Sequence, residues 1–392
     1  MTIQYAPPLA VNFVWNFVDS ASVQPILDVI RTNLARDKDK PFSRGLNIPL
    51  FFFSSHNANE VPKSHPAALA QKNIIFVFTS VNTNGRGDWK EYVESIPLSS
   101  DTSIISVAID SHGLNHAGSL DSLNCIRVYK WPAVNQELHS IIELAHEIYR
   151  HGFNTIDPAE TGKSYSITAF LSHAKMGDTG RLHAEAIKKF IDNTNMNRFF
   201  DATEISPGFA FDREIEEKVK QSTLVAIESD SYSSRYWCQR EILSAKKHNR
   251  PVIVVNSLED YEDRIFPAAS NVPCIHVSPT SPISERDILR ILSATILETL
   301  RYFHSLMSLN FYRDIGWIGS DCGLSARPPE VRQALNFKGS GINKMCYPEP
   351  PIYAEEADWH EHLGIEAFTP LWNAQESNSF IHHRLGLSVS EV

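Results

Sequence analysis

"TLVAIESDSYSSRYWCQREILSA", residues 223–245, joins an apolar run, a serine-rich loop and a helical pattern. The run "LVAI" is apolar at every position, which is typical of a strand buried on both faces of a parallel sheet. In the helix that follows, Trp237 and Glu241 are four residues apart and share a face, and Ala245 continues the same stripe. The stretch therefore predicts one strand, loop and helix unit of an α/β fold.

The same alternation extends over most of the chain. Buried strands are predicted by "LAVNFVW", "IPLFFFS", "NIIFVF" and "TSIISVAI" in the first part, and by "SITAFLSH" and "PVIVVN" in the second. Residues 181–194 have apolar positions at helical spacing. A turn-rich linker, "RHGFNTIDPAETGKSY", separates the two parts. We expect two flavodoxin-like, parallel-sheet α/β lobes, with domains at residues 1–155 and 163–302.

The two parts also resemble each other. "IIFVFTSVNTNGRGDWKEYVESI", residues 74–96, repeats the order of apolar strand, polar loop and tryptophan-led helix. Aligning Trp89 with Trp237 places Val93 where the second part has Glu241. The first part is therefore predicted to be a degenerate copy that keeps the scaffold and lacks the acid.

The last part, residues 303–392, is rich in proline, with "SARPPEV", "YPEPPIY" and "FTPLWN". Proline at this density disfavours long helices and interior strands. Several tryptophans and tyrosines supply apolar area to bury. We expect an irregular C-terminal extension that packs on the globular body or on a partner.

Composition excludes several classes of protein. The 392 residues have a formal net charge of -10, and no stretch is dense enough in Lys and Arg to predict direct nucleic-acid binding. The five cysteines are never arranged as CxxC, which favours reduced thiols over a disulfide framework or a zinc site. Cys238 has no basic partner beside it and is predicted to be a small buried side chain. No apolar stretch is long enough to span a bilayer, so we expect a cytoplasmic protein. We also expect no bound metal, because the cysteine spacing does not fit a zinc site.

Residues 163–280 resemble a TIR (Toll/interleukin-1 receptor) domain, most closely those of bacteria. "FLSHAKMGD" is similar to the first box of the family, in which an apolar strand ends in Ser and a charged loop. "FFDATEISPGFAFDREI" resembles the segment leading into the mobile BB loop of the family. "SDSYSSRYWCQRE" resembles the loop and W-C-x-x-E helix in which enzymatic members carry their catalytic glutamate. The three segments occur in the family's order and in the expected strand, loop and helix contexts.

The resemblance implies an enzyme that cleaves NAD+ between nicotinamide and ribose, with Glu241 as the catalytic carboxylate. NAD+ would be the substrate, and no cofactor is expected. Nicotinamide leaves as a neutral base from a cationic pyridinium, so the leaving group needs no general acid, unlike that of an ordinary glycoside. One carboxylate can then stabilise the oxocarbenium-like ribosyl centre.

Other residues near the predicted strand ends are candidates for binding NAD+. Ser172, His173 and Lys175 follow the first strand of the second lobe and are placed to contact ribose or phosphate. Phe209 on the BB loop and Trp237 are candidates for stacking on a ring. Each has a structural alternative, which is core packing for Trp237 and a hydrated loop position for His173 and Lys175.

For the whole protein, the resemblance implies a bacterial antiphage defence effector or signal producer. Such proteins act through self-association of TIR lobes and with a defence-system partner, and their product is ADP-ribose or a cyclised form. The alternative is a non-enzymatic TIR adaptor whose loops serve only contacts between domains. A receiver or another flavodoxin-like module is disfavoured, because "FLSHAK" supplies neither an acidic cluster nor a phosphate-binding loop.

Overall fold

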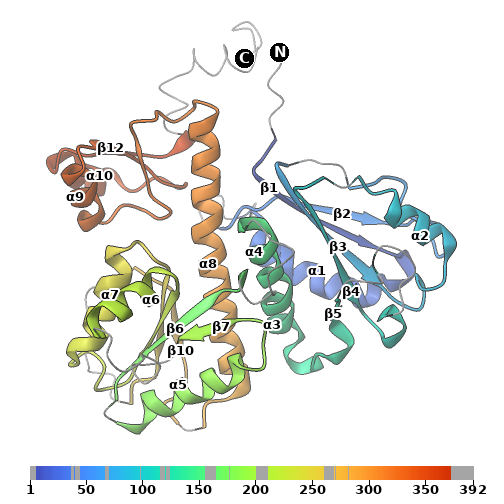
Figure 1. The fold of residues 1–392 in the computed structure, drawn as a ribbon, viewed down its shortest axis with the longest axis horizontal. Coiled ribbons are helices and arrows are strands. Elements are labelled where there is room, and N and C mark those ends of the chain that lie inside the picture. Colours follow the sequence, from blue (N-terminus) through green and yellow to red (C-terminus); the bar gives the residue numbers. More distant parts are fainter. Residues whose placement is uncertain are drawn as a thin grey trace, which may run out of the picture. The chain divides into compact units, whose positions relative to one another are not determined.

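The computed structural model describes residues 6–36, 39, 45–66, 70–97, 99–114, 120, 124–154, 165–175, 177–199, 211–259, 269, 271–280 and 282–371. The chain divides into two compact units (Figure 1). One contains residues 1–130 and 301–392, and the other contains residues 131–300. Within the described part, no helix is both long enough and apolar enough to cross a membrane.

The first unit contains a five-stranded parallel sheet with the order β2-β1-β3-β4-β5. Its strands β1 and β3 are rich in aromatic and β-branched residues and are buried almost throughout, as expected for a sheet covered on both faces. The strands are β1 (Leu9–Trp15), β2 (Leu50–Ser54), β3 (Lys72–Thr79), β4 (Thr102–Ala108) and β5 (Ile126–Arg127). The helical segments are η1 (Phe17–Asp19), α1 (Ser20–Leu34), α2 (Gly87–Glu94), η2 (Ser111–Leu114) and η3 (Val128–Lys130).

The second unit contains another five-stranded parallel sheet, with the order β10-β9-β8-β6-β7. Its strands are β6 (Thr168–His173), β7 (Asn197–Phe199), β8 (Thr223–Glu228), β9 (Val252–Asn256) and β10 (Cys274–His276). The main helices are α5 (Asp178–Ile191), α6 (Phe211–Lys220) and α7 (Tyr236–Lys247). Numbered within each sheet, both have the order 2-1-3-4-5, which is the flavodoxin-like arrangement. The predicted fold class of two α/β lobes is confirmed.

Alternate residues of each strand face opposite helical layers in the second unit. Phe170, Leu224 and Ala226 pack with Ile215 of α6 and Ile242 of α7 in one buried cluster. Because side chains alternate along a strand, their neighbours face the opposite layer, where α5 lies (Figure 1). Ser172 therefore belongs to the α7 face of the sheet, two residues beyond Phe170.

The second unit begins with a short helical connection: η4 (Ala133–Asn135), α3 (Gln136–Ser140), the π-helical turn η5 (Ile141–Ala145) and α4 (His146–Phe153). His146 Nε2 accepts a hydrogen bond from the backbone N–H of Ile167 at 3.2 Å, which ties α4 to the start of β6. This segment falls in the second unit. The predicted boundaries at residues 155, 163 and 302 stay a prediction.

Helix α8 (Glu285–Asp314) leads into a small third sheet, β11-β12-β13, which belongs to the first unit. Its elements are β11 (Gly323–Leu324), α9 (Val331–Gly339), β12 (Lys344–Cys346), α10 (Ala354–His362) and β13 (Glu366–Phe368). The prediction of an irregular extension is therefore wrong for residues 303–371, while residues 372–392 lie outside the described part. The prolines lie between these elements, as at residues 328–329 and 350–351, so they separate the helices and strands without interrupting them.

Candidate functional site

The candidate site lies at the carboxyl edge of the second sheet, where β6 and β8 are neighbours. The chain leaves β6 toward β7 on one side, and β8 continues to β9 on the other. In open α/β sheets, ligands bind where the connections diverge in this way, beyond the carboxyl ends of the strands. Ser172 comes from β6, Tyr232 from the loop after β8 and Glu241 from α7.

These three side chains form a connected set of hydrogen bonds. The hydroxyl of Ser172 donates to Oε2 of Glu241 at 2.5 Å and lies 2.6 Å from the hydroxyl of Tyr232. Ser172 and Tyr232 are fully buried, whereas Glu241 is half-buried. The arrangement therefore connects the interior of the lobe to a carboxylate at the edge of the sheet.

The surroundings of Tyr232 keep its hydroxyl protonated. Burial raises the pKa of Tyr232 well above its ordinary value, and the neighbouring groups Cys238, Glu241 and Glu228 act in the same direction. Burial also raises the pKa of Cys238 to about 12, so its thiol stays protonated near neutral pH. The prediction that Cys238 is a small buried side chain is confirmed. All five cysteines are free.

Helix α7 presents a different face to the core from the one that its sequence suggests. Its buried residues are Cys238, Ile242 and Ala245. Trp237 is 39% exposed, so core packing does not explain this residue. Its ring lies 5.3 Å from that of Tyr236 in an edge-on arrangement and 5.6 Å from the guanidinium carbon of Arg240. Of the predicted stripe, Ala245 is therefore buried in the core, whereas Trp237 and Glu241 are partly exposed.

The other predicted binding residues are only partly assembled around Glu241. His173 is half-buried at the last position of β6, and Lys175 is exposed in the loop that follows. Phe209 lies outside the described residues. The roles proposed for these residues, and for Ser172 and Trp237, stay predictions.

Comparison with known proteins assigns the family of this lobe. Residues 170–289 match the family model described as "TIR domain". This part of the chain is a TIR domain. The match includes Ser172 in β6, Lys175 in the loop that follows and the whole of α7 with Glu241, so the expected family is confirmed for the second lobe.

Solved structures provide further similarities. The TIR domains of the activated Roq1 resistosome, which directly recognises the pathogen effector XopQ, are 23% identical, with a TM-score of 0.21. The match covers 23% of this chain and 57% of that chain. The ligand-free, open structure of CD0873, a substrate-binding protein with adhesive properties from Clostridium difficile, is 13% identical, with a TM-score of 0.19. That match covers 73% of this chain and 95% of that chain. Among curated proteins, no sequence matches.

The corresponding edge of the first lobe is built differently from that of the TIR lobe. Trp89 is only 3% exposed and packs with Val93 in the core beside α2, so the first lobe places apolar side chains where the TIR lobe has Trp237 and Glu241. Although the two sheets share a strand order, that order is common to flavodoxin-like folds. The assignment of the first lobe as a degenerate TIR copy stays a prediction.

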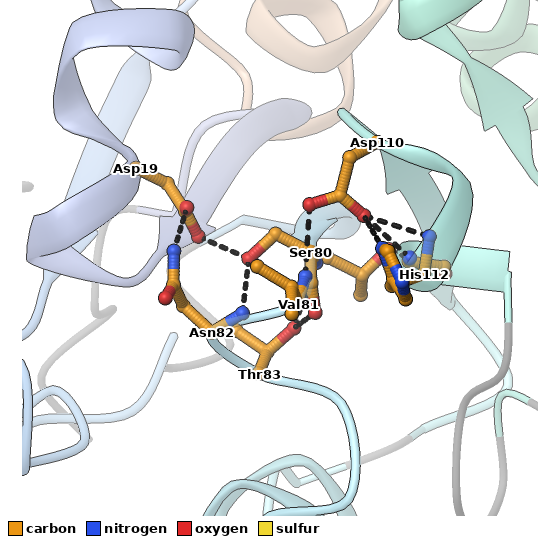
Figure 2. A network of polar contacts seen from close by, with 9 residues as sticks. Asp19, Ser80, Val81, Asn82, Thr83, Asp110 and His112 are labelled. Carbon is orange, nitrogen blue, oxygen red and sulfur yellow. Dashed lines mark hydrogen bonds and ion pairs between the residues drawn. The ribbon is translucent and has the colours of Figure 1, made fainter.

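A polar network closes the carboxyl edge of the first lobe (Figure 2). Asp19, after β1, accepts hydrogen bonds from the hydroxyl of Ser80 at 2.6 Å and from the side-chain amide of Asn82 at 2.7 Å. Asp110, after β4, accepts from the backbone N–H groups of Val81 and His112, each at 2.9 Å. These carboxylates hold the loop after β3 in place, which is a structural role.

Two residues at the TIR site were missed by the predictions from sequence. Tyr232 was treated as part of a serine-rich loop, although a large aromatic residue among small polar ones is itself a sign of an anchored loop. Glu228 is only 1% exposed and ends β8 on the same face as Ala226, because side chains alternate along a strand. Its position at the end of an otherwise apolar strand was the available signal.

Proposed function

We propose that the TIR lobe cleaves NAD+ at the bond between nicotinamide and ribose, with Glu241 as the catalytic carboxylate. The observation that carries this proposal is the 2.5 Å hydrogen bond from Ser172 to Glu241, which holds a half-buried acid where the connections of the sheet diverge. A surface acid that serves only in ion pairing does not need a buried serine from another strand to orient it.

The chemistry requires only one carboxylate. As the C–N bond breaks, its electron pair goes to the ring nitrogen, and the pyridinium becomes neutral nicotinamide without taking a proton. Positive charge develops on the ribosyl carbon and ring oxygen, where a fixed negative charge lowers the barrier. Water then attacks the ribosyl carbon and loses a proton, which gives ADP-ribose. Attack by a nucleophile within the same molecule would give a cyclised product.

The remaining candidates have side chains that suit binding of NAD+. The half-exposed ring of Trp237 offers an apolar surface for stacking, and the exposed Lys175 offers a positive charge for a phosphate. His173, at the last position of β6, offers a further polar contact. We include Phe209 in the binding set because of its position in the family's motifs. Ser172 was also predicted to bind NAD+, but its buried hydroxyl is directed at Glu241, so we propose that it acts through that carboxylate.

We also propose that activity depends on assembly and serves antiphage defence in bacteria. Self-association of TIR lobes would complete the site. The first lobe would then regulate or scaffold the assembly, and a defence-system partner would supply the trigger. These proposals rest on the resemblance to bacterial TIR proteins and on the presence of two lobes with one strand order.

The test is NAD+ consumption by the purified protein and by Glu241→Gln, with and without a crowding agent that promotes assembly. We expect the wild type to release nicotinamide and Glu241→Gln to lose at least about 100-fold of that rate. The matched control is Glu185→Gln on α5, which neutralises an exposed acid paired with Arg181 and should leave the rate unchanged. Chromatography of the products distinguishes ADP-ribose from a cyclised form.

Two results would contradict the enzymatic proposal. Equal rates for the wild type and Glu241→Gln would remove the catalytic role of this residue. A folded, assembled wild type that releases no nicotinamide, also when isolated from phage-infected cells, would favour the adaptor function.

A further inference from the structure

We propose that Tyr232 is a positioning residue for Glu241 and acts through Ser172, an inference that rests on the proposed function of the TIR lobe. The three side chains form a relay in which the phenol orients the serine and the serine orients the carboxylate. Tyr232 itself would not touch NAD+, because it is completely buried.

Proton counting gives the direction of the relay. A serine hydroxyl has one hydrogen to donate and two lone pairs that accept. The hydrogen of Ser172 is donated to Oε2 of Glu241 at 2.5 Å. The contact of 2.6 Å between the two hydroxyls therefore has Tyr232 as donor and Ser172 as acceptor. Without the phenol, the serine hydroxyl would lose the partner that fixes its rotation.

Of the groups that face Tyr232, all but Ser172 raise the pKa of its phenol and so favour the protonated form that this direction requires. They come from three elements: Ser172 from β6, Glu228 from β8, and Cys238 and Glu241 from α7. Burial is the main cause that raises the pKa of the phenol well above its ordinary value, and Cys238, Glu241 and Glu228 act in the same direction. The phenol of Tyr232 is therefore protonated near neutral pH and can donate its hydrogen to Ser172.

The relay is also anchored rigidly. The ring of Tyr232 packs in the same apolar cluster as Phe170, Ala226 and Ile242, so its hydroxyl has little freedom to move. Buried hydroxyl groups are costly unless they are hydrogen-bonded, and here each satisfies the other. The position of the carboxylate at the edge of the sheet is thereby fixed by the packed core of the lobe.

The first lobe differs from the TIR lobe at both of these positions. Aligned on Trp89 and Trp237, it has Val93 at the position of Glu241 and Asn84 at the position of Tyr232. The lobe without the acid thus also lacks the phenol.

The test uses the full chain with Tyr232→Phe, Ser172→Ala and the double variant. Tyr232→Phe removes only the hydroxyl and keeps the ring in the core. The control is Tyr92→Phe, which removes another buried phenol, one that donates to the backbone carbonyl of Ser64 in the first lobe. Two readouts are needed: the kinetics of NAD+ cleavage over pH, and crystal structures that show where the carboxylate of Glu241 lies.

We expect Tyr232→Phe to lower kcat by about 10- to 100-fold with little change in KM, because a misplaced carboxylate is felt mainly in the transition state. In the double variant the loss should equal that of Ser172→Ala alone, because the phenol acts only through the serine. Both single variants should move the acidic limb of the pH profile to higher pH, since hydrogen-bond donation favours an ionised carboxylate. Tyr92→Phe should change none of these values.

Unchanged kcat and an unchanged acidic limb in Tyr232→Phe would overturn the relay, as would losses that multiply in the double variant. If Tyr232→Phe does not fold, Ser172→Ala decides the same point, and full activity of that variant would overturn the proposal. If the wild type does not cleave NAD+, the proposed function is wrong, and the relay is then tested only by the crystal structures of the variants. The relay then holds if the Glu241 carboxylate moves by about 1 Å or more in both single variants, and falls if it stays in place.

Discussion

Two histidines in the interior of the protein, His146 and His304, are neutral. Burial lowers the pKa of each from its ordinary value of 6.5 to about 4. His146 accepts a hydrogen bond from the backbone N–H of Ile167 through Nε2, which only the neutral ring can do. Protonation of this ring therefore disrupts the start of the TIR lobe.

The sign of the resulting pH dependence follows from the depressed pKa. The unfolded chain binds protons at these histidines between about pH 6.5 and 4, whereas the folded protein does not. Their contribution to stability is therefore complete above pH 6.5 and is lost as pH falls toward 4. For His146 alone this amounts to about 3 kcal/mol.

We therefore expect the wild type to lose free energy of unfolding between pH 7 and pH 5 in denaturant titrations. His146→Gln keeps an acceptor without a titrating ring and should lose about 1 to 2 kcal/mol less over that interval. His56→Gln, at an exposed position, is the control and should behave as the wild type does. The same loss in all three proteins would show that His146 does not set this dependence.

At the scale of elements, close packing at the carboxyl edge of the first lobe limits what η2 can tolerate. A Cβ added at Gly113 would lie 2.4 Å from the backbone oxygen of Thr79, at the end of β3. The same glycine accepts a hydrogen bond from the Thr79 hydroxyl at 3.0 Å and donates to Asp110 at 2.8 Å. Any larger residue must push η2 away from the sheet and strain these contacts.

We expect Gly113→Ala to lower the free energy of unfolding by about 1 to 3 kcal/mol. Gly87→Ala is the matched control, because nothing lies within 4 Å of its added Cβ, and it should stay within about 0.5 kcal/mol of the wild type. Denaturant unfolding of both variants measures the difference. Equal stability of the two would mean that η2 moves aside without cost.

At the scale of the whole molecule, two units share a strand order but only one contains the candidate acid. The compact unit at residues 131–300 includes the TIR domain together with α3 and α4. A division of labour follows from the proposed function, with cleavage in one unit and control of assembly in the other.

A chain truncated to residues 131–300 tests this division. We expect it to stay folded and to remain a monomer over a concentration range in which the full chain associates, because the first lobe supplies an assembly surface. Its rate of NAD+ cleavage should fall accordingly. Light scattering coupled to size-exclusion chromatography gives the masses. Identical mass distributions and rates for the two chains would show that the first lobe has no part in assembly.

Local patterns in the sequence determined most of the fold. Fully apolar runs such as "LVAI" and "IIFVF" predicted strands buried on both faces, and the structure has β8 and β3 there. The three TIR-like segments led to the family of the second lobe. These signals predict local structure well, because hydrophobic periodicity and turn residues act over only a few positions along the chain. The C-terminal part was misjudged for a related reason, since proline counts do not show whether prolines lie inside elements or between them.

The geometry of the site depended on the tertiary structure. Ser172 forms hydrogen bonds with Tyr232, which is 60 positions away in the chain, and with Glu241, which is 69 positions away. The register of β6 against β8 and the packing of α7 bring these residues together. The exposure of Trp237 was decided in the same way, by which face of α7 meets the sheet. The sequence by itself determined the strands and helices of the two lobes, the family of the second lobe and the candidate acid, because these depend on neighbours along the chain. Which side chains orient that acid was decided only by the tertiary structure, because contacts between distant residues are set by strand register and helix rotation.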